Sequence, residues 1–330
     1  MAETLLRVDD LRVNFATRHG VVAPVRGISF QVNAHETLGI IGESGCGKSV
    51  TAQALMGLLP PRTSRVSGDI TLAGRSLHSL SFNARRRLNG QTMAMIFQDP
   101  LSSLNPVLTV GFQIDESLRL HTALDLSQRR EKILTLLQQV GITDPQRCAS
   151  AWPHELSGGM RQRIMIAMAI ASSPALLIAD EPTTALDATI QAQILDLLDE
   201  IKQQTGMGIV FITHDLSVVA RLCQRVVVLY AGEVVEETDV LTLFARPRHP
   251  YTRALLAARP SADSQPKSAL REIAGQVPSL YTPPSGCAFA DRCPLAQPRC
   301  RAQGPALRPV DIPSHRVRCW RADDTGVLLS

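Results

Sequence analysis

The sequence lacks a long hydrophobic run. Its most apolar stretch, residues 164–179, is interrupted by Ser172, Ser173 and Pro174, whereas a membrane-spanning helix needs about 20 apolar residues. The N-terminus also lacks the basic region and the apolar core of a signal peptide. We therefore expect a chain that neither crosses a membrane nor is secreted, and that stays in the cytosol.

Net charge is also small. The 34 Lys and Arg residues against 30 Asp and Glu residues give +4, which is too balanced to indicate a nucleic-acid binder by charge alone. Hydrophobic residues make up 45% of the sequence, which excludes global disorder. The length of 330 residues suggests about two domains. Seven cysteines in a reducing compartment are not a disulfide framework, so a group of them would indicate metal binding or reactivity.

Buried strands alternate with amphipathic helices. Apolar runs at residues 37–41, 175–179 and 208–212 are typical of fully buried parallel strands. The apolar residues from Ile190 to Ile201 fall on one helical face. Alternating residues at 11–15 and 28–32 predict half-exposed strands of an antiparallel N-terminal β region. The sequence therefore predicts an α/β fold with a parallel sheet core.

The pattern becomes helical between residues 98 and 172, with one apolar stripe that stops at Gly141, a suitable C-terminal cap. We predict a helical subdomain at approximately 99–172, inserted into a domain spanning 1–245. After Arg246 many prolines punctuate a segment with little periodicity. Residues 246–330 are therefore predicted to form a separate C-terminal extension.

One motif indicates phosphate binding. A buried strand is followed by Gly42, Glu43, Ser44, Gly45, Cys46, Gly47, Lys48 and Ser49, which fit the pattern G-x-x-x-x-G-K-[ST]. Glycines allow backbone N–H groups to surround phosphate oxygens, and the following helix directs its positive end at them. Lys48 would contact the β and γ phosphates, and the Ser49 hydroxyl would bind Mg²⁺. The alternative is a chance glycine-rich turn.

A second strand ends in two acids, Asp180 and Glu181. Ligands of open α/β sheets bind at the carboxyl ends of parallel strands. Asp180 is therefore a candidate to hold Mg²⁺ through water, and Glu181 a candidate general base for an attacking water. The alternative is a solvated charged turn.

Residues 156–162 read Leu-Ser-Gly-Gly-Met-Arg-Gln. Here the chain resembles the ATP-binding-cassette (ABC) ATPases, whose signature reads LSGGQ. Ser157, Gly158 and Gly159 match, and Met160 replaces the usual Gln. In that family the signature contacts the ATP held by a partner cassette.

The resemblance implies further roles. Gln98 corresponds to a glutamine that senses Mg²⁺ and the attacking water, and residues 185–187 resemble the D-loop. His214 corresponds to the switch histidine at the γ-phosphate. Phe15 lies where the family places an aromatic residue that stacks on adenine, although it could equally be a core strand residue.

Residues 247–256 contain His249-Pro250-Tyr251 and resemble a block of the ATPases that energise peptide and nickel importers. The resemblance implies a motor subunit for uptake of a small solute and favours di- or oligopeptides, with nickel or another small solute as the alternative. It also implies a second, related ABC ATPase or a second copy, two permease subunits and an extracytoplasmic solute-binding protein. The chain would then lie at the cytoplasmic face of the inner membrane.

A soluble nucleic-acid-associated ABC ATPase is the rival class. Its repair members insert long coiled coils between the phosphate loop and the signature, and its translation members carry two cassettes in one chain. This chain has neither sustained heptads nor a second cassette, so we expect no nucleic-acid partner. An exporter cassette is a closer rival, which the His-Pro-Tyr block disfavours.

The cysteines fall into three kinds. Cys46 lies in the phosphate loop at a helix N-terminus, which predicts a lowered thiol pKa and ready alkylation. Cys148 and Cys223 are expected to be ordinary buried residues. Four thiols in the tail suit either Zn²⁺ or an iron–sulfur cluster, and the family resemblance favours a [4Fe–4S] cluster over zinc, with free thiols as the remaining alternative. These four are Cys287, Cys293, Cys300 and Cys319.

Overall fold

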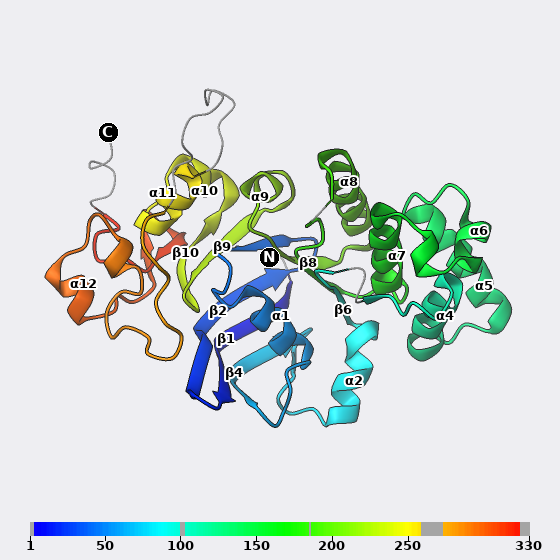
Figure 1. Cartoon of the computed structure of the whole chain (residues 1–330), viewed down its shortest axis with the longest axis horizontal. Coiled ribbons are helices and arrows are strands. Elements are labelled where there is room, and N and C mark those ends of the chain that lie inside the picture. The colour runs from blue at the N-terminus through cyan, green and yellow to red at the C-terminus, as the bar shows by residue number, and fades with distance from the viewer. Residues whose placement is uncertain (1–2, 100–102, 185, 259–272, 324–330) are drawn as a thin grey trace. The chain divides into compact units, whose positions relative to one another are not determined.

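The computed structural model describes residues 3–99, 103–184, 186–258 and 273–323 (Figure 1). Within these limits the chain forms two compact units. The first unit contains the residues up to 6, 31–37 and 71–212, and the second contains 7–30, 38–70 and those from 213 onward.

The first unit contains three parallel strands in the order β8-β7-β6. Strand β7 (Leu176–Asp180) pairs on one side with β6 (Met93–Ile96) and on the other with β8 (Gly208–Ile212). Every residue of the three strands is buried. Continuous apolar runs are what a strand covered on both faces requires, and the strands expected near 175–179 and at 208–212 are confirmed.

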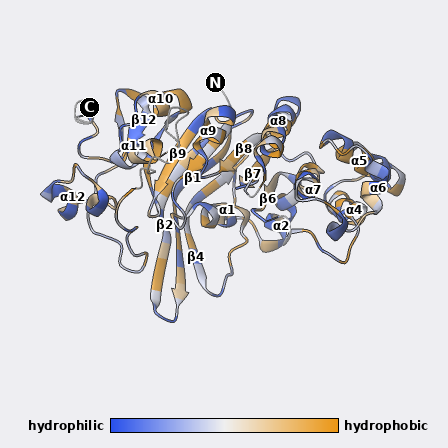
Figure 2. Cartoon of the chain, turned by 45° about the horizontal axis from the view of Figure 1, so that its top comes forward, coloured by the Kyte–Doolittle hydropathy of each residue, from blue (hydrophilic) through white to orange (hydrophobic). Residues whose placement is uncertain are grey.

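Helix α8 (Ala188–Thr205) shows how the sequence sets the limits of a helix. Asp187 begins it, because its carboxylate accepts a hydrogen bond from the N–H of Ile190, and Gly206 ends it with a left-handed backbone. Its buried face includes Ile194, Leu198 and Ile201, as the helical spacing predicts. Figure 2 shows hydrophobic and hydrophilic residues on different sides of this helix.

The remaining helices of the first unit lie largely in the segment where the sequence pattern becomes helical. Four of them pack on one another, with α7 also packing on β6. They are α4 (Val110–His121), α5 (Leu126–Gln139), α6 (Pro145–Ser150) and α7 (Gly158–Ile170). Before them come the short strand β5 (Arg75–Ser76) and α2 (Phe82–Gln91), and a single turn, η1 (Pro153–Glu155), precedes α7.

The second unit contains a mixed group of strands in the order β11-β12-β10-β9-β3. Strand β3 (Thr37–Ile41) runs parallel to β9 (Arg225–Tyr230), and β9 pairs antiparallel with β10 (Glu233–Asp239). Strands β12 (Ile312–Val317) and β11 (Arg308–Val310) extend the sheet beyond β10. These last two strands were not expected, because the segment after Arg246 has little periodicity of its own. Pairing with an existing strand supplies the order instead.

The N-terminal strands of the second unit follow the order β2-β1-β4. They are β1 (Thr4–Thr17), β2 (Gly20–Asn33) and β4 (Ser64–Leu72). Leu11 and Val13 of β1 are fully buried while Arg12 between them is exposed, so the predicted alternation is confirmed there.

Short helices complete the second unit. They are α1 (Lys48–Met56), α9 (Leu216–Leu222), α10 (Val240–Ala245), α11 (Pro250–Ala257), the single turn η2 (Ala290–Arg292) and α12 (Pro298–Ala302). Across the described part of both units, no helix combines the length and the apolarity that crossing a bilayer demands.

Candidate functional site

The phosphate loop, Gly42–Ser49, connects β3 to α1 in the second unit. Two of its glycines have no room for a side chain. A Cβ on Gly42 would lie 2.2 Å from the carbonyl oxygen of Leu229, and one on Gly47 would lie 2.3 Å from that of Pro24. Gly47 also has a φ of 100° as the N-cap of α1, a conformation that favours glycine. Neighbouring backbone therefore encloses the loop tightly.

Lys48 opens α1 and is 6% exposed. Its Nζ donates hydrogen bonds to the carbonyl oxygens of Gly42 at 2.7 Å and Glu43 at 3.0 Å, which holds the ammonium group over the loop. Ser49 follows it and is partly exposed. A cation, a helix N-terminus and the loop's N–H groups together make an anion-binding arrangement.

Cys46 corrects an expectation. The thiol is only 1% exposed, and burial raises its pKa, although the Lys48 ammonium works in the opposite direction. The helix N-terminus was expected to lower this pKa, and that was wrong because desolvation of the thiolate outweighs the nearby positive charge. Cys148 and Cys223 are buried as expected, with exposures of 3% and 7%.

Two further candidates belong to the second unit. His214 is exposed and follows Thr213, whose N–H donates to the carbonyl oxygen of Ile40 at 3.2 Å. That bond fixes the backbone just before the histidine. Phe15 lies on β1 and is half-buried, which leaves part of its ring accessible.

The first unit brings Gln98 and Glu181 together. Asp180, the last residue of β7, is 4% exposed, and Glu181 follows it with a φ of 46°. This left-handed conformation is strained for a glutamate, and the bond from its N–H to the carbonyl oxygen of Ile212 (2.9 Å) helps to hold it. The Glu181 Oε2 atom accepts hydrogen bonds from Gln98 Nε2 at 3.2 Å and from Thr184 Oγ1 at 3.0 Å. The carboxylate is therefore fixed at the end of the strand.

The signature residues begin α7. The Ser157 side chain caps the helix by accepting a hydrogen bond from the N–H of Met160 at 3.3 Å. Ser157 and Gly158 are exposed and Gly159 is partly exposed. These residues therefore present a helix N-terminus to the outside of the first unit. Of the D-loop residues, Ala185 lies outside the described part of the chain, and Asp187 caps α8.

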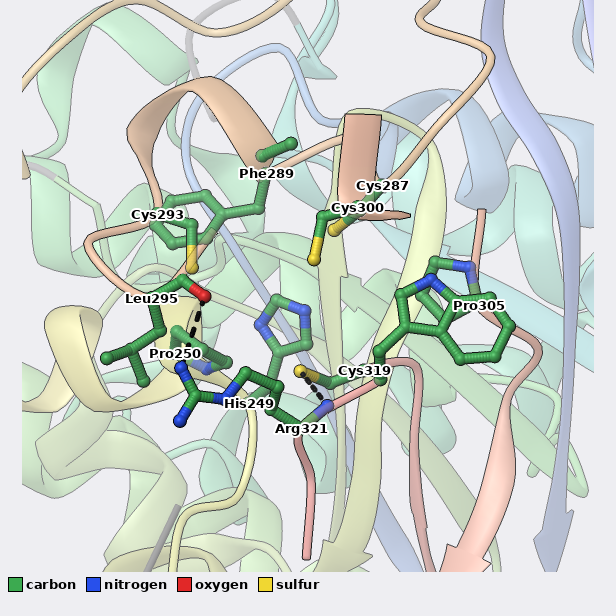
Figure 3. A pocket seen from close by; sticks show the side chains of 12 residues that line it. His249, Pro250, Cys287, Phe289, Cys293, Leu295, Cys300, Pro305, Cys319 and Arg321 are labelled. Carbon is green, nitrogen blue, oxygen red and sulfur yellow. Dashed lines mark hydrogen bonds between the residues drawn. The ribbon is translucent and has the colours of Figure 1, made fainter. Parts of the chain in front are cut away.

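All four tail cysteines line one pocket of the second unit (Figure 3). The N–H of Cys287 donates to the carbonyl oxygen of Cys300 at 2.7 Å, which brings two of the segments together. Burial is the main cause that raises the pKa of Cys287 to about 12 and that of Cys319 to about 11, and it also raises the pKa of Cys293. The remaining lining is mostly apolar, including Phe289 and Leu295.

His249 also lines this pocket and is 1% exposed. Its Nδ1 accepts a hydrogen bond from the N–H of Tyr251 at 3.1 Å, and burial lowers its pKa to about 4. The ring is therefore neutral and carries its proton on Nε2. That atom is buried and makes no short hydrogen bond within the described residues, although a backbone group of Arg318 interacts with the ring and opposes the fall in its pKa.

The His-Pro-Tyr block has a physical explanation that the sequence did not reveal. His249 caps α11, and Pro250 occupies the first turn, where its missing N–H is not needed. The Tyr251 hydroxyl accepts a hydrogen bond from the backbone N–H of Glu43, in the phosphate loop, at 2.9 Å. The fully buried Glu236 accepts from the N–H groups of Arg248 (2.7 Å) and His249 (2.8 Å). The block therefore joins the extension to the loop.

Sequence reasoning missed Glu236, Tyr251 as a loop contact, and Arg292. Arg292 makes a bidentate ion pair with Glu43, with distances of 2.7 and 3.0 Å. The His-Pro-Tyr block was the only signal for Tyr251, and nothing near Arg292 in the sequence indicates its partner.

The fold is that of ABC cassettes of known structure. The dimeric ATP-binding cassette MJ0796, in a post-hydrolysis state bound to ADP and Pi, superposes with a TM-score of 0.64 at 25% identity, covering 72% of this chain and 99% of that one. The structure of cbiO1 from Clostridium perfringens, part of the ABC transporter complex cbiONQ, superposes with a TM-score of 0.63 at 27% identity. The match covers 74% of this chain and 92% of that one.

Curated relatives cover nearly the whole chain. A probable peptide ABC transporter ATP-binding protein, y4tR, of Sinorhizobium fredii is 51% identical over 98% of this chain and 96% of its own. The dipeptide transport ATP-binding protein DppD of Escherichia coli is 50% identical over 98% of each chain. DppD of Bacillus subtilis is 47% identical over 97% of this chain and 96% of its own.

The ABC transporter family matches residues 25–184, and this chain belongs to that family as an ATP-binding protein. Residues 235–300 match the oligopeptide/dipeptide transporter C-terminal region, which confirms the second resemblance. The chain is therefore an ATPase whose hydrolysis is coupled to transport, and ATP with Mg²⁺ is expected at its site.

Among the described residues, no three His, Cys, Asp or Glu side chains are grouped so as to hold one metal ion. The four cysteines share a pocket without converging on a single point.

Proposed function

We propose that this chain is the ATP-hydrolysing motor subunit of an importer for di- or oligopeptides. The observation that carries the proposal is the identity of about half the residues, over nearly the whole chain, with proteins named for peptide transport. The Tyr251 contact supports it, because the block typical of that group bonds directly to the phosphate loop.

The phosphate loop would hold the ATP phosphates. Its N–H groups, the N-terminus of α1 and Lys48 supply positive charge, and the partly exposed ring of Phe15 would stack on adenine. Mg²⁺ would shield the charge of the β and γ phosphates. Ser49, Gln98 and Asp180 suit it because they offer hydroxyl, amide and carboxylate oxygens, and Gln98 keeps its amide oxygen available when its Nε2 bonds to Glu181.

Glu181 would accept a proton from the attacking water. Gln98 and Thr184 hold its Oε2, which fixes the position of the carboxylate at the end of β7. Exposed His214 would contact the γ-phosphate and report whether it is present. Both roles need the side chains to be fixed by their backbone, as the bonds at Ile212 and Thr213 provide.

A complete site would need a second cassette. Ser157, Gly158 and Gly159 present the N-terminus of α7 outward, where it would contact ATP on the partner's phosphate loop. The partner would be a related ATPase or a second copy. Two permease subunits and a solute-binding protein would complete the importer, with this chain peripheral at the cytoplasmic face of the inner membrane. We also retain the division into residues 1–245 and 246–330 as a proposal.

We further propose that the cysteine pocket holds a [4Fe–4S] cluster, with zinc as the alternative. Four thiolates of a zinc site must all lie about 2.3 Å from one ion, whereas those of a cluster each bind a different iron. Four cysteines that share a pocket without converging are easier to reconcile with the cluster. His249 lines the same pocket, and its Nε2–H would be a donor to cluster sulfurs.

Elemental analysis tests the cluster. After anaerobic purification we expect a brown protein with about four irons and as many sulfides per chain, both lost in Cys293→Ser. One zinc per chain would favour the alternative, and a colourless, metal-free, folded protein would exclude both.

Transport assays test the substrate class. The complete importer in proteoliposomes should take up a labelled dipeptide when ATP is enclosed on the side of this chain. Uptake of ⁶³Ni²⁺ without peptide uptake would overturn peptide import but leave the ATPase assignment intact. A hydrolysis rate that responds to neither solute would contradict coupling to either.

A further inference from the structure

Arg292 of the C-terminal extension binds the phosphate loop. It lies in η2, directly before Cys293, and its partner Glu43 is 249 positions earlier in the chain. Nη1 donates to Glu43 Oε2 at 2.7 Å and Nη2 donates to Oε1 at 3.0 Å. Parallel bonds of this kind fix the orientation of both side chains.

Every N–H of the guanidinium group is used. Besides the two bonds to Glu43, Nη1 donates to the Tyr230 hydroxyl at 3.2 Å, Nη2 to the carbonyl oxygen of Ile273 at 2.7 Å and Nε to that of Ala274 at 3.0 Å. The side chain is 5% exposed and that of Glu43 25%. The bond to Glu43 is the largest cause that raises the pKa of Arg292. Lysine could not reproduce this arrangement, since it lacks the planar fork of donors.

Tyr251 holds the same residue from its backbone side, through the bond between its hydroxyl and the Glu43 N–H. Its ring is fully buried and lies 4.7 Å from that of Tyr230 and 5.5 Å from that of Phe289, between ring centroids. The hydroxyl position is therefore set by packing. Phe289 also lines the cysteine pocket, so one aromatic cluster contacts both the pocket and the loop's partner.

We propose that Arg292 and Tyr251 are positioning residues for ATP binding, which hold Glu43 so that the phosphate loop keeps its phosphate-binding shape. Neither residue needs to touch the nucleotide. Glu43 directly follows Gly42, and its carbonyl oxygen accepts a bond from Lys48 Nζ. Release of Glu43 therefore loosens both the first turn of the loop and the anchor of its lysine. The inference rests on the proposed function, because it requires residues 42–49 to bind the phosphates.

The test uses the full chain in the purified importer and measures the Kd for ATP, the KM and the kcat. Arg292→Gln should raise Kd and KM about tenfold, equivalent to about 1.4 kcal/mol and to a lost charged hydrogen bond. The kcat at saturating ATP should stay within about twofold, because Glu181 and its contacts are unchanged. Arg292→Lys should recover part of the loss, about threefold remaining.

A double-mutant cycle identifies the partner. Glu43→Gln should match Arg292→Gln, and the double variant should be no worse than either, because both remove one interaction. Arg301→Gln is the matched control, since Arg301 is an exposed arginine of the same extension, 3.5 Å from Asp291. It should behave as the wild type. Additive effects of the two single changes would overturn the pairing.

Two further variants keep the outcome decisive. If Arg292→Gln does not fold, Tyr251→Phe keeps the ring but loses the acceptor for Glu43 N–H, and it should raise KM about threefold. An unchanged KM in folded variants, or a loss confined to kcat, would overturn the inference. Lys48→Ala separates the two proposals: if it binds ATP normally, residues 42–49 are not the phosphate site and the proposed function fails instead.

Discussion

The phosphate loop and the cysteine pocket lie in the same compact unit but are built differently. The eight residues 42–49 are contiguous in the sequence and run from the end of β3 into the first turn of α1, so a local motif identifies them. The pocket assembles residues from 249 to 321, held together by the buried Glu236, an aromatic cluster and an added strand pair. A local site can be identified from its sequence, whereas an assembled site depends on contacts that sequence distance conceals.

The two regions nevertheless share structural support. Phe289 packs against Tyr230 and Tyr251 and lines the pocket, and Arg292 bonds to the loop from its place next to Cys293. The comparison therefore predicts distinct effects for changes at four places: the general base Glu181, the cysteine pocket, the buried Glu236 that joins the extension to its sheet, and the loop thiol of Cys46.

The largest effect is expected when the general base of ATP hydrolysis, Glu181, is replaced. Glu181→Gln should bind ATP normally but hydrolyse it more slowly by about 10²-fold or more, because an amide cannot accept the proton of water. Steady-state ATPase activity and nucleotide binding of the purified importer would separate the two steps. Near-normal turnover would remove Glu181 from the role of general base.

Loss of one pocket cysteine should affect the extension first. If a cluster or zinc is bound, Cys293→Ser should release it and destabilise the C-terminal extension, because metal binding supplies folding free energy. Limited proteolysis with metal analysis would follow both changes, and Cys148→Ser is the matched control in the first unit. An intact extension in a metal-free Cys293→Ser protein would show that the pocket needs no metal.

The hydrogen bonds of the buried Glu236 should contribute to the free energy of unfolding. Glu236→Ala leaves two backbone N–H groups and His315 Nε2 without their acceptor, and we expect a loss of about 3 kcal/mol. Chemical denaturation measures it. Asp311→Ala, which removes an exposed partner of Arg248, should cost far less. Equal losses of unfolding free energy in the two variants would mean that burial does not determine how much these contacts stabilise the protein.

Cys46 should give the smallest effect. Since burial raises the thiol pKa above its ordinary value, little thiolate exists at neutral pH, and alkylation by N-ethylmaleimide should be slow and accelerate as the pH rises. Cys46→Ser should remain active, because the loop binds phosphate through its backbone. Rapid labelling of Cys46 at pH 7, seen by mass spectrometry, would restore the original expectation of a reactive thiol.

How far the sequence predicts this molecule varies with the range of the contacts. Strands β7 and β8 and the apolar face of α8 follow from neighbouring residues, so local pattern was sufficient. The family resemblance supplied the candidate roles of Gln98 and His214, which composition could not.

The extension was less predictable. The pairing of β12 with β10 and the bond from Glu43 to Tyr251 join residues about 80 and 208 positions apart. Neither contact produces a periodic pattern in the sequence from which it could be predicted. The left-handed backbone of Glu181 was equally hidden, because it is held by a bond from the neighbouring strand. The raised pKa of Cys46 needed knowledge of burial.

The C-terminal extension, through Arg292, is inferred to hold the phosphate loop in shape. Amide hydrogen exchange of nucleotide-free Arg292→Gln, with Arg301→Gln as control, tests it most directly. We predict faster exchange in peptides covering residues 42–49, with little change in those covering β7, because release of Glu43 loosens the loop locally. Unchanged protection of residues 42–49 in a folded Arg292→Gln protein would show that Arg292 does not hold the loop.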